Sequence, residues 1–118
     1  FTIVHSLDGY DEISLTGETK IITNDGEKIC TAESLGKRMV SPEDIYGGNT
    51  TAEAAKIFLK ILKGGGSWAQ NAVVIANAAI ALSSTGNYPD YEHCYALAVE
   101  SLESGKAYQS FEKLISLQ

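Results

Sequence analysis

The stretch that decides the fold is Phe1-Thr2-Ile3-Val4-His5, followed by Ser6-Leu7-Asp8-Gly9-Tyr10-Asp11-Glu12. The first run is rich in apolar and β-branched residues and predicts a β-strand. The second run sets three carboxylates around a glycine, which lets the backbone turn sharply so that neighbouring carboxylates converge instead of alternating across a strand. Mg²⁺ is often held by one or two such carboxylates, together with water and substrate phosphates. The alternative interpretation is a solvated acidic turn between two strands, which binds nothing.

The composition narrows the function classes. A length of 118 residues allows one domain, and a formal charge of -6 with Arg38 as the single arginine argues against a nucleic-acid-binding or membrane-binding surface. Cys30 and Cys94 have no metal-ligand spacing and make no disulfide framework, so the cytoplasm is the expected compartment. The chain begins at Phe1 without an initiator methionine or a signal segment, and we therefore expect a fragment of a longer protein.

Turn signals divide the first third of the chain into short strands. The runs Ile13–Leu15 and Thr19–Thr23 are rich in β-branched residues and flank Thr16-Gly17, which predicts a hairpin. Asn24-Asp25-Gly26 predicts a second hairpin turn, leading into a strand over Lys28–Thr31. We therefore expect three antiparallel strands after the acidic segment, with all strands within about residues 1–35.

From about residue 41 to residue 117 the sequence predicts helices. The expected N-cap residues of these helices are Ser41, Thr50, Ser67 and Asp90. The segment from Ala72 to Leu82 is apolar on all sides except for Asn77, so we expect a core helix in which Asn77 ties the helix to a neighbouring backbone. Trp68, at the start of this helix, is expected to be partly buried. The expected fold is one α/β domain in which strands precede a helical layer.

Two further residues are candidates for substrate contact. His5 ends the first strand beside the acidic segment, where it would orient a ligand or a carboxylate, or serve only the structure. Gly9, the glycine between the carboxylates that lets the backbone turn sharply, is the second candidate. No nucleophilic triad can be assembled, and Cys30 and Cys94 are interpreted as small core residues.

The sequence resembles the anthranilate phosphoribosyltransferase family. Val4-His5-Ser6-Leu7-Asp8-Gly9-Tyr10-Asp11-Glu12 is similar to that family's strand and acidic loop. Further segments resemble later signatures of the family in the same order, namely Pro42-Glu43-Asp44, Asn77-Ala78-Ala79 and Ser104-Gly105-Lys106-Ala107. Ser6 departs from the pattern, since glycine is usual there, and so does Glu53-Ala54-Ala55, where the family tends to have Glu-Asn-Ala. The resemblance is to the C-terminal part of the family's catalytic α/β domain.

This resemblance implies a Mg²⁺-dependent transfer of the phosphoribosyl group from phosphoribosyl pyrophosphate to anthranilate, in tryptophan biosynthesis. Asp11 and Glu12 match the family's metal-binding carboxylates. The family's glycine-rich loop and anthranilate-binding residues would lie before Phe1, so the fragment alone is expected to be inactive, and the full-length enzyme is expected to be a homodimer. The alternatives are a piece of a pyrimidine nucleoside phosphorylase-like enzyme and a stand-alone acidic module that binds a protein partner.

Overall fold

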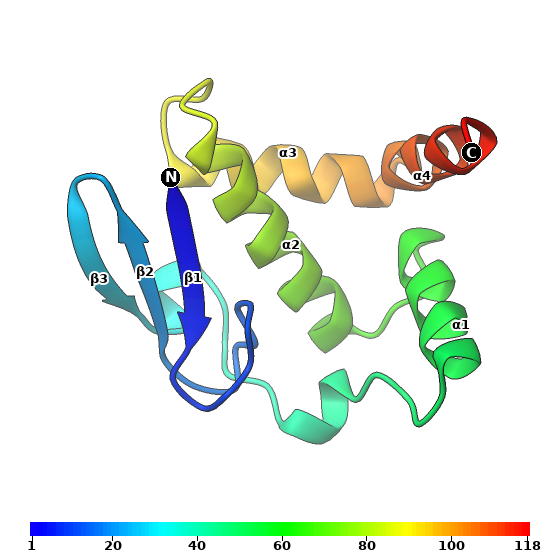
Figure 1. The fold of residues 1–118 in the computed structure, drawn as a ribbon, viewed down its shortest axis with the longest axis horizontal. Helices are drawn as coiled ribbons and strands as arrows, with labels where there is room; N and C mark the ends of the chain where they lie inside the picture. Colours follow the sequence, from blue (N-terminus) through cyan, green and yellow to red (C-terminus); the bar gives the residue numbers. More distant parts are fainter.

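The three β-strands of the protein form one antiparallel sheet. A computed structural model describes residues 1–118, with β1 (Thr2–Ser6), β2 (Thr19–Thr23) and β3 (Gly26–Cys30) in the order β1-β2-β3 (Figure 1). The predicted turn at Asn24-Asp25-Gly26 is confirmed, because Thr23 lies opposite Gly26. β1 pairs directly with β2, from Thr2 opposite Thr23 to Ser6 opposite Thr19.

The predicted strand at Ile13–Leu15 is wrong. This segment belongs to the loop from β1 to β2, so two strands follow the acidic segment instead of three. Leu15 has a φ of 60°, a left-handed conformation that does not fit a strand. Ile13 and Leu15 are each 1% exposed and lie in the hydrophobic core. Burial of these two side chains therefore decides the conformation in place of strand pairing, and the Leu15 carbonyl accepts a hydrogen bond from the Val40 N–H at 3.0 Å.

Two short 3₁₀ helices and four α-helices follow the sheet. They are η1 (Glu33–Leu35), η2 (Pro42–Ile45), α1 (Thr51–Leu62), α2 (Trp68–Ser84), α3 (Tyr91–Glu103) and α4 (Lys106–Ser116). The predicted N-caps of the α-helices are confirmed: Thr50, Ser67 and Asp90 each accept a hydrogen bond from the backbone N–H three residues later. Gly105, with a φ of 82°, separates α3 from α4 as the sequence indicates.

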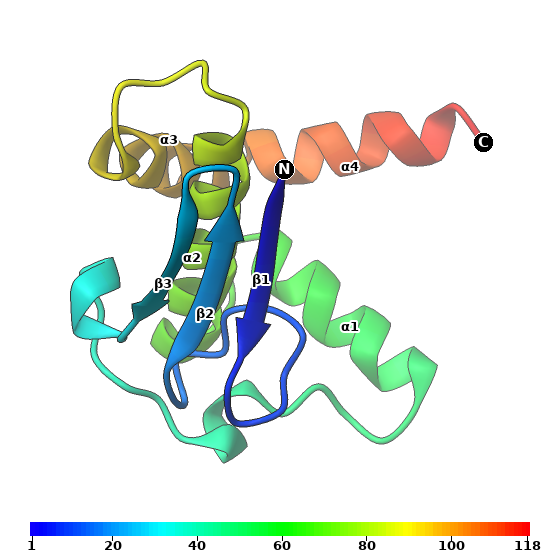
Figure 2. The same ribbon diagram turned by 60° about the vertical axis from the view of Figure 1, so that its left-hand side comes forward.

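Helix α2 carries the core of the protein. It runs alongside the sheet on one side and crosses α3 on the other (Figures 1 and 2). Its buried residues are Ala69, Ala72, Ile75, Ala76 and Ala79, and the alanines let the neighbouring segments approach closely. The core interpretation of Cys30 and Cys94 is confirmed, since both are buried free cysteines. Trp68 is more exposed than the sequence indicated, at 46%, and its ring is covered by the guanidinium of Arg38, which lies 4.2 Å from the ring centroid.

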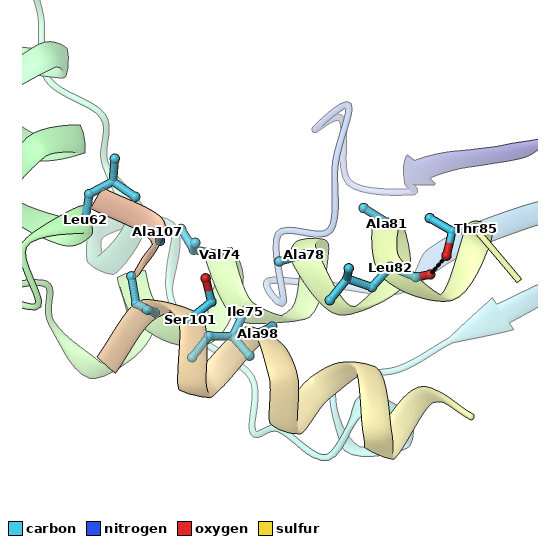
Figure 3. Close-up of a pocket in the computed structure, with 11 residues that line it drawn as sticks. Leu62, Val74, Ile75, Ala78, Ala81, Leu82, Thr85, Ala98, Ser101 and Ala107 are labelled. Atoms are coloured by element: carbon cyan, nitrogen blue, oxygen red, sulfur yellow. Dashed lines mark hydrogen bonds between the residues drawn. The ribbon is translucent and has the colours of Figure 1, made fainter. Parts of the chain in front are cut away.

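The apolar faces of α1 and α4 are only partly covered. Neither helix contains a buried residue, although Phe58 of α1 and Phe111 of α4 meet edge to face with centroids 5.1 Å apart. An apolar groove of about 490 Å³ opens where the four helices approach one another. Figure 3 shows it, and its lining includes Leu62, Val74, Ile75, Ala78, Leu82 and Leu102.

No helix has both the length and the apolar character needed to cross a bilayer.

Candidate functional site

The acidic loop, Leu7–Glu12, leaves the end of β1 and folds back onto Ser6. The Ser6 N–H donates to the Tyr10 carbonyl at 3.1 Å, and the Gly9 N–H donates to the Ser6 carbonyl at 3.2 Å. Gly9 has a φ of 103°, which other residues rarely adopt. The sharp turn expected from the sequence is therefore present, and it depends on the glycine.

A cluster of three buried hydroxyl groups lies beneath the loop. The Ser6 Oγ lies 3.3 Å from the Ser14 Oγ and 3.4 Å from the Thr19 Oγ1. It also accepts from the Ser14 N–H at 3.3 Å and donates to the Glu12 carbonyl at 2.5 Å. The hydroxyl cluster (Ser6, Ser14 and Thr19) thus connects both ends of the loop to β2.

Asp8 differs from the other two carboxylates of the loop because its side chain is used within the protein. It accepts hydrogen bonds from the Thr16 hydroxyl and, at 3.5 Å, from the Ser14 hydroxyl. A Cβ added at Gly17 would lie 3.0 Å from the Asp8 Oδ2, so the absence of a side chain there leaves room for this carboxylate. The sequence pattern alone assigned Asp8 no role distinct from that of Asp11 or Glu12.

Asp11 and Glu12 are both exposed, and neither carboxylate is in a salt bridge. The protein has no group of three or more histidine, cysteine or acidic side chains that would form a complete metal cage. Two free carboxylates nevertheless suit Mg²⁺, which is commonly bound by one or two of them and takes its other ligands from water and phosphate. The residues present therefore fit a cation shared with a phosphorylated ligand, and they do not fit a structural metal site.

Asn77 fixes the exit of the acidic loop. Its Oδ1 accepts from the Ile13 N–H at 3.0 Å, and its Nδ2 donates to the Ile13 carbonyl at 2.8 Å and to the Val73 carbonyl at 2.9 Å. The prediction that Asn77 ties its helix to a neighbouring backbone is confirmed. Because Ile13 directly follows Glu12, helix α2 holds the end of the loop in place.

His5 stands apart from this network. It is an exposed residue of β1 opposite Lys20, and its imidazole makes no hydrogen bond within the protein. The structure therefore gives His5 no contact with a carboxylate of the loop, and a role in orienting a ligand stays a prediction.

The structure also shows a hollow of about 430 Å³ between the acidic loop and η2, which the sequence did not indicate. Tyr10 contributes from the loop, and Pro42, Glu43, Ile45, Tyr46 and Gly47 contribute from η2 and the turn after it. Tyr10 and η2 are more than thirty positions apart, so only the folded chain brings them together. The acidic loop therefore borders this hollow on the side where Tyr10 lies.

The comparisons with known proteins place this chain in a family. A family model described as "Glycosyl transferase family, a/b domain" matches residues 1–108, and the chain belongs to this glycosyl transferase family. Among individual relatives, the chain is similar to proteins named anthranilate phosphoribosyltransferase. It is 52% identical to the one from Christiangramia forsetii and 50% identical to one from Bacteroides fragilis, in each case over 99% of this chain and 35% of the relative.

A solved structure agrees with these relatives. The crystal structure of anthranilate phosphoribosyltransferase from Thermus thermophilus matches with a TM-score of 0.83 and 29% sequence identity, over 98% of this chain and 34% of that one. The expected α/β fold and the resemblance seen in the sequence are therefore confirmed. The chain spans about a third of the length of the relatives it matches.

Proposed function

We propose that the chain is part of a Mg²⁺-dependent anthranilate phosphoribosyltransferase. Such an enzyme moves the phosphoribosyl group from phosphoribosyl pyrophosphate to the amino group of anthranilate, releases pyrophosphate, and serves tryptophan biosynthesis. The observation that carries the proposal is the identity of about half of the residues, over nearly the whole chain, with relatives of that name. Because the relatives are named for anthranilate, this reaction is favoured over that of a nucleoside phosphorylase. The match to a glycosyl transferase family favours an enzyme over a protein-binding module.

In this proposal Asp11 and Glu12 hold the cation. Bound Mg²⁺ would neutralise charge on the departing pyrophosphate. Their carboxylates have no partner within the protein and are available for this role, whereas the carboxylate of Asp8, which is also exposed, accepts from the Thr16 hydroxyl. Gly9 keeps the turn of the loop open beside them, and His5 lies where β1 leads into the loop, so both are proposed to lie near the substrate.

The remaining features concern the whole enzyme. We propose that most residues contacting phosphoribosyl pyrophosphate and anthranilate come from outside these 118 residues, that the full enzyme is a cytoplasmic homodimer, and that it binds neither nucleic acid nor membrane. The charge of -6 supports the last point, because both of those partners are anionic.

The test uses a hybrid enzyme, in which this chain replaces the matching third of the Christiangramia forsetii enzyme. Anthranilate consumption is followed by fluorescence with phosphoribosyl pyrophosphate and varied Mg²⁺. We expect an active hybrid, and the double variant Asp11→Asn with Glu12→Gln should lower turnover by about a hundredfold, since a metal clamp contributes several kcal/mol. The melting temperature without Mg²⁺ should be unchanged or slightly higher, because two neighbouring carboxylates repel each other.

The matched control removes the same charge elsewhere, through Asp25→Asn in the β2–β3 turn and Glu112→Gln on α4. This control should keep the activity of the hybrid. An inactive hybrid that folds would contradict the proposed reaction. A double variant at Asp11 and Glu12 with normal turnover and normal Mg²⁺ dependence would show that the loop is a solvated turn.

A further inference from the structure

We propose that Ser6 and Asp8 are positioning residues that hold the acidic loop in shape before a cation binds, and that Asp8 is not itself a metal ligand. This inference rests on the proposed function, because it concerns the same loop. It divides three neighbouring carboxylates into two classes. All three residues are exposed, but the Asp8 carboxylate accepts hydrogen bonds from the protein, while the carboxylates of Asp11 and Glu12 have no partner within it.

The first argument is the set of partners of Asp8. Its carboxylate accepts from the hydroxyls of Thr16 and Ser14, both in the segment that leads from the loop into β2. The lack of a side chain at Gly17 leaves the space that the Asp8 carboxylate needs. A cation at Asp8 would have to compete with these donors, whereas no such competition exists at Asp11 or Glu12. The local chain is thus arranged around an Asp8 that acts as a hydrogen-bond acceptor.

The second argument is the direct contact between Ser6 and the backbone of Glu12. Ser6 is fully buried, and its Oγ donates to the Glu12 carbonyl at 2.5 Å while its own N–H donates to the Tyr10 carbonyl at 3.1 Å. The last residue of β1 therefore restrains the backbone of a proposed metal ligand. Outer residues of this kind commonly change metal affinity by about 10–100-fold when they are replaced.

The third argument is the rarity of buried polar groups in this protein. Ser6, Ser14 and Thr19 are its only buried polar residues, and all three belong to the hydroxyl cluster. Burying a hydroxyl group is unfavourable unless it is hydrogen-bonded, so an apolar core would be the simpler way to pack this site. Instead, the hydroxyl cluster hydrogen-bonds the acidic loop and joins it to β2. Gathering all buried polar residues at one place is consistent with a loop that must keep a fixed shape.

The experiment measures cation binding apart from catalysis. Mn²⁺ is titrated into the hybrid enzyme, alone and with inorganic pyrophosphate, and free Mn²⁺ is followed by electron paramagnetic resonance. We expect Ser6→Ala and Thr16→Val to raise the Mn²⁺ dissociation constant about tenfold. The Mg²⁺ concentration for half-maximal rate should rise by the same factor, and saturating Mg²⁺ should restore turnover. Thr16→Ser keeps the hydroxyl and should bind Mn²⁺ as the parent does.

Asp8→Asn separates the two possible roles of that carboxylate. The amide oxygen can still accept from the Thr16 hydroxyl, and only the longer hydrogen bond from the Ser14 hydroxyl, at 3.5 Å, loses its acceptor. A positioning role therefore predicts a change in Mn²⁺ affinity within about fivefold. A ligand role predicts a loss as large as that of Asp11→Asn, and this result would overturn the inference for Asp8. Ser34→Ala, which removes a hydroxyl from the exposed turn at η1, is the control and should leave Mn²⁺ binding unchanged.

The remaining outcomes are also decisive. If Ser6→Ala does not fold, Thr16→Val carries the test, because Thr16 is only half-buried. Its loss removes one contact to the Ser14 hydroxyl, at 2.7 Å, but keeps the contacts of Ser6 with Ser14 and Thr19. A variant that melts at lower temperature but binds Mn²⁺ normally would show a purely structural role and overturn the proposal. If the double variant at Asp11 and Glu12 binds Mn²⁺ as tightly as the parent, the proposed metal site itself is wrong, which is a different failure.

Discussion

Replacing Asn77 with alanine should release the exit of the acidic loop. Asn77 is the only side chain that hydrogen-bonds the Ile13 peptide groups, at 3.0 Å to the N–H and 2.8 Å to the carbonyl. Ile13 is 1% exposed, so water cannot replace these bonds without opening the structure. The third bond, to the Val73 carbonyl, matters less because that carbonyl is part of the α2 hydrogen-bond ladder.

The loss of stability in Asn77→Ala follows from the N–H and the carbonyl of Ile13, which are left without hydrogen-bond partners. Each buried donor or acceptor that loses its partner lowers the stability by about 1–3 kcal/mol. Because the structure around Ile13 can partly relax, we expect a total loss of about 3 kcal/mol for both groups. Since about 1.4 kcal/mol corresponds to a factor of ten, opening of this segment should become about a hundredfold more frequent. Asn77→Asp keeps the acceptor for the Ile13 N–H but sets a carboxylate against the Ile13 carbonyl, so it should be at least as damaging.

Hydrogen exchange of the peptide that contains Ile13, measured by mass spectrometry on the hybrid enzyme, reads this opening directly. Asn87→Ala, in the exposed loop between α2 and α3, is the matched control and should leave the exchange rate unchanged. Exchange at Ile13 in Asn77→Ala that stays within about threefold of the parent, a difference below about 1 kcal/mol, would refute the assignment of Asn77 as the anchor of the loop.

Three further predictions follow from the same structure. Gly17→Ala should force the Asp8 carboxylate to move, lowering stability by about 1–3 kcal/mol and raising the Mg²⁺ concentration for half-maximal rate, as melting curves and kinetics of the hybrid can test. Burial, with a smaller contribution from Cys30, raises the pKa of Tyr91 to about 12 from its usual value of 10.0. Stability should therefore be unaffected by Tyr91 below about pH 10 and should fall between pH 10 and 12, so the melting temperature of Tyr91→Phe should fall less steeply over that interval. The 118-residue chain alone should show no anthranilate consumption above background, because positioning of both substrates supplies much of the barrier reduction, and activity near that of the hybrid would contradict this.

The elements that the sequence predicted correctly are those with local signals. The helix starts at Thr50, Ser67 and Asp90 follow from side chains that bind backbone N–H groups three residues away, so neighbours in sequence contain the whole interaction. Asn77 was predictable for a related reason, since one amide on an otherwise apolar helix requires a partner, although the sequence could not show that the partner is Ile13.

The errors and omissions concern contacts between distant residues. Ile13–Leu15 has the residue types of a strand, but packing into the core under α2 and hydrogen bonds from Asn77 and Val40 fix a different conformation. The distinct role of Asp8 depends on Thr16 and Gly17, eight and nine positions away, which no local pattern connects. The sequence therefore indicated the acidic loop as a candidate but not the groups that shape it.

The exposed apolar residues near the end of α4 also affect how this chain behaves in concentrated solution. Leu114 and Ile115 of α4 are 55% and 54% exposed, so contacts between molecules would bury apolar surface, while the charge of -6 keeps molecules apart. The repulsion extends about 10 Å at 0.1 M salt and less at higher concentration, whereas sulfate strengthens apolar association. Light scattering should therefore show that the molecules repel one another at low ionic strength and attract one another as ammonium sulfate is added. The salt concentration should thus set whether this protein stays dispersed or associates.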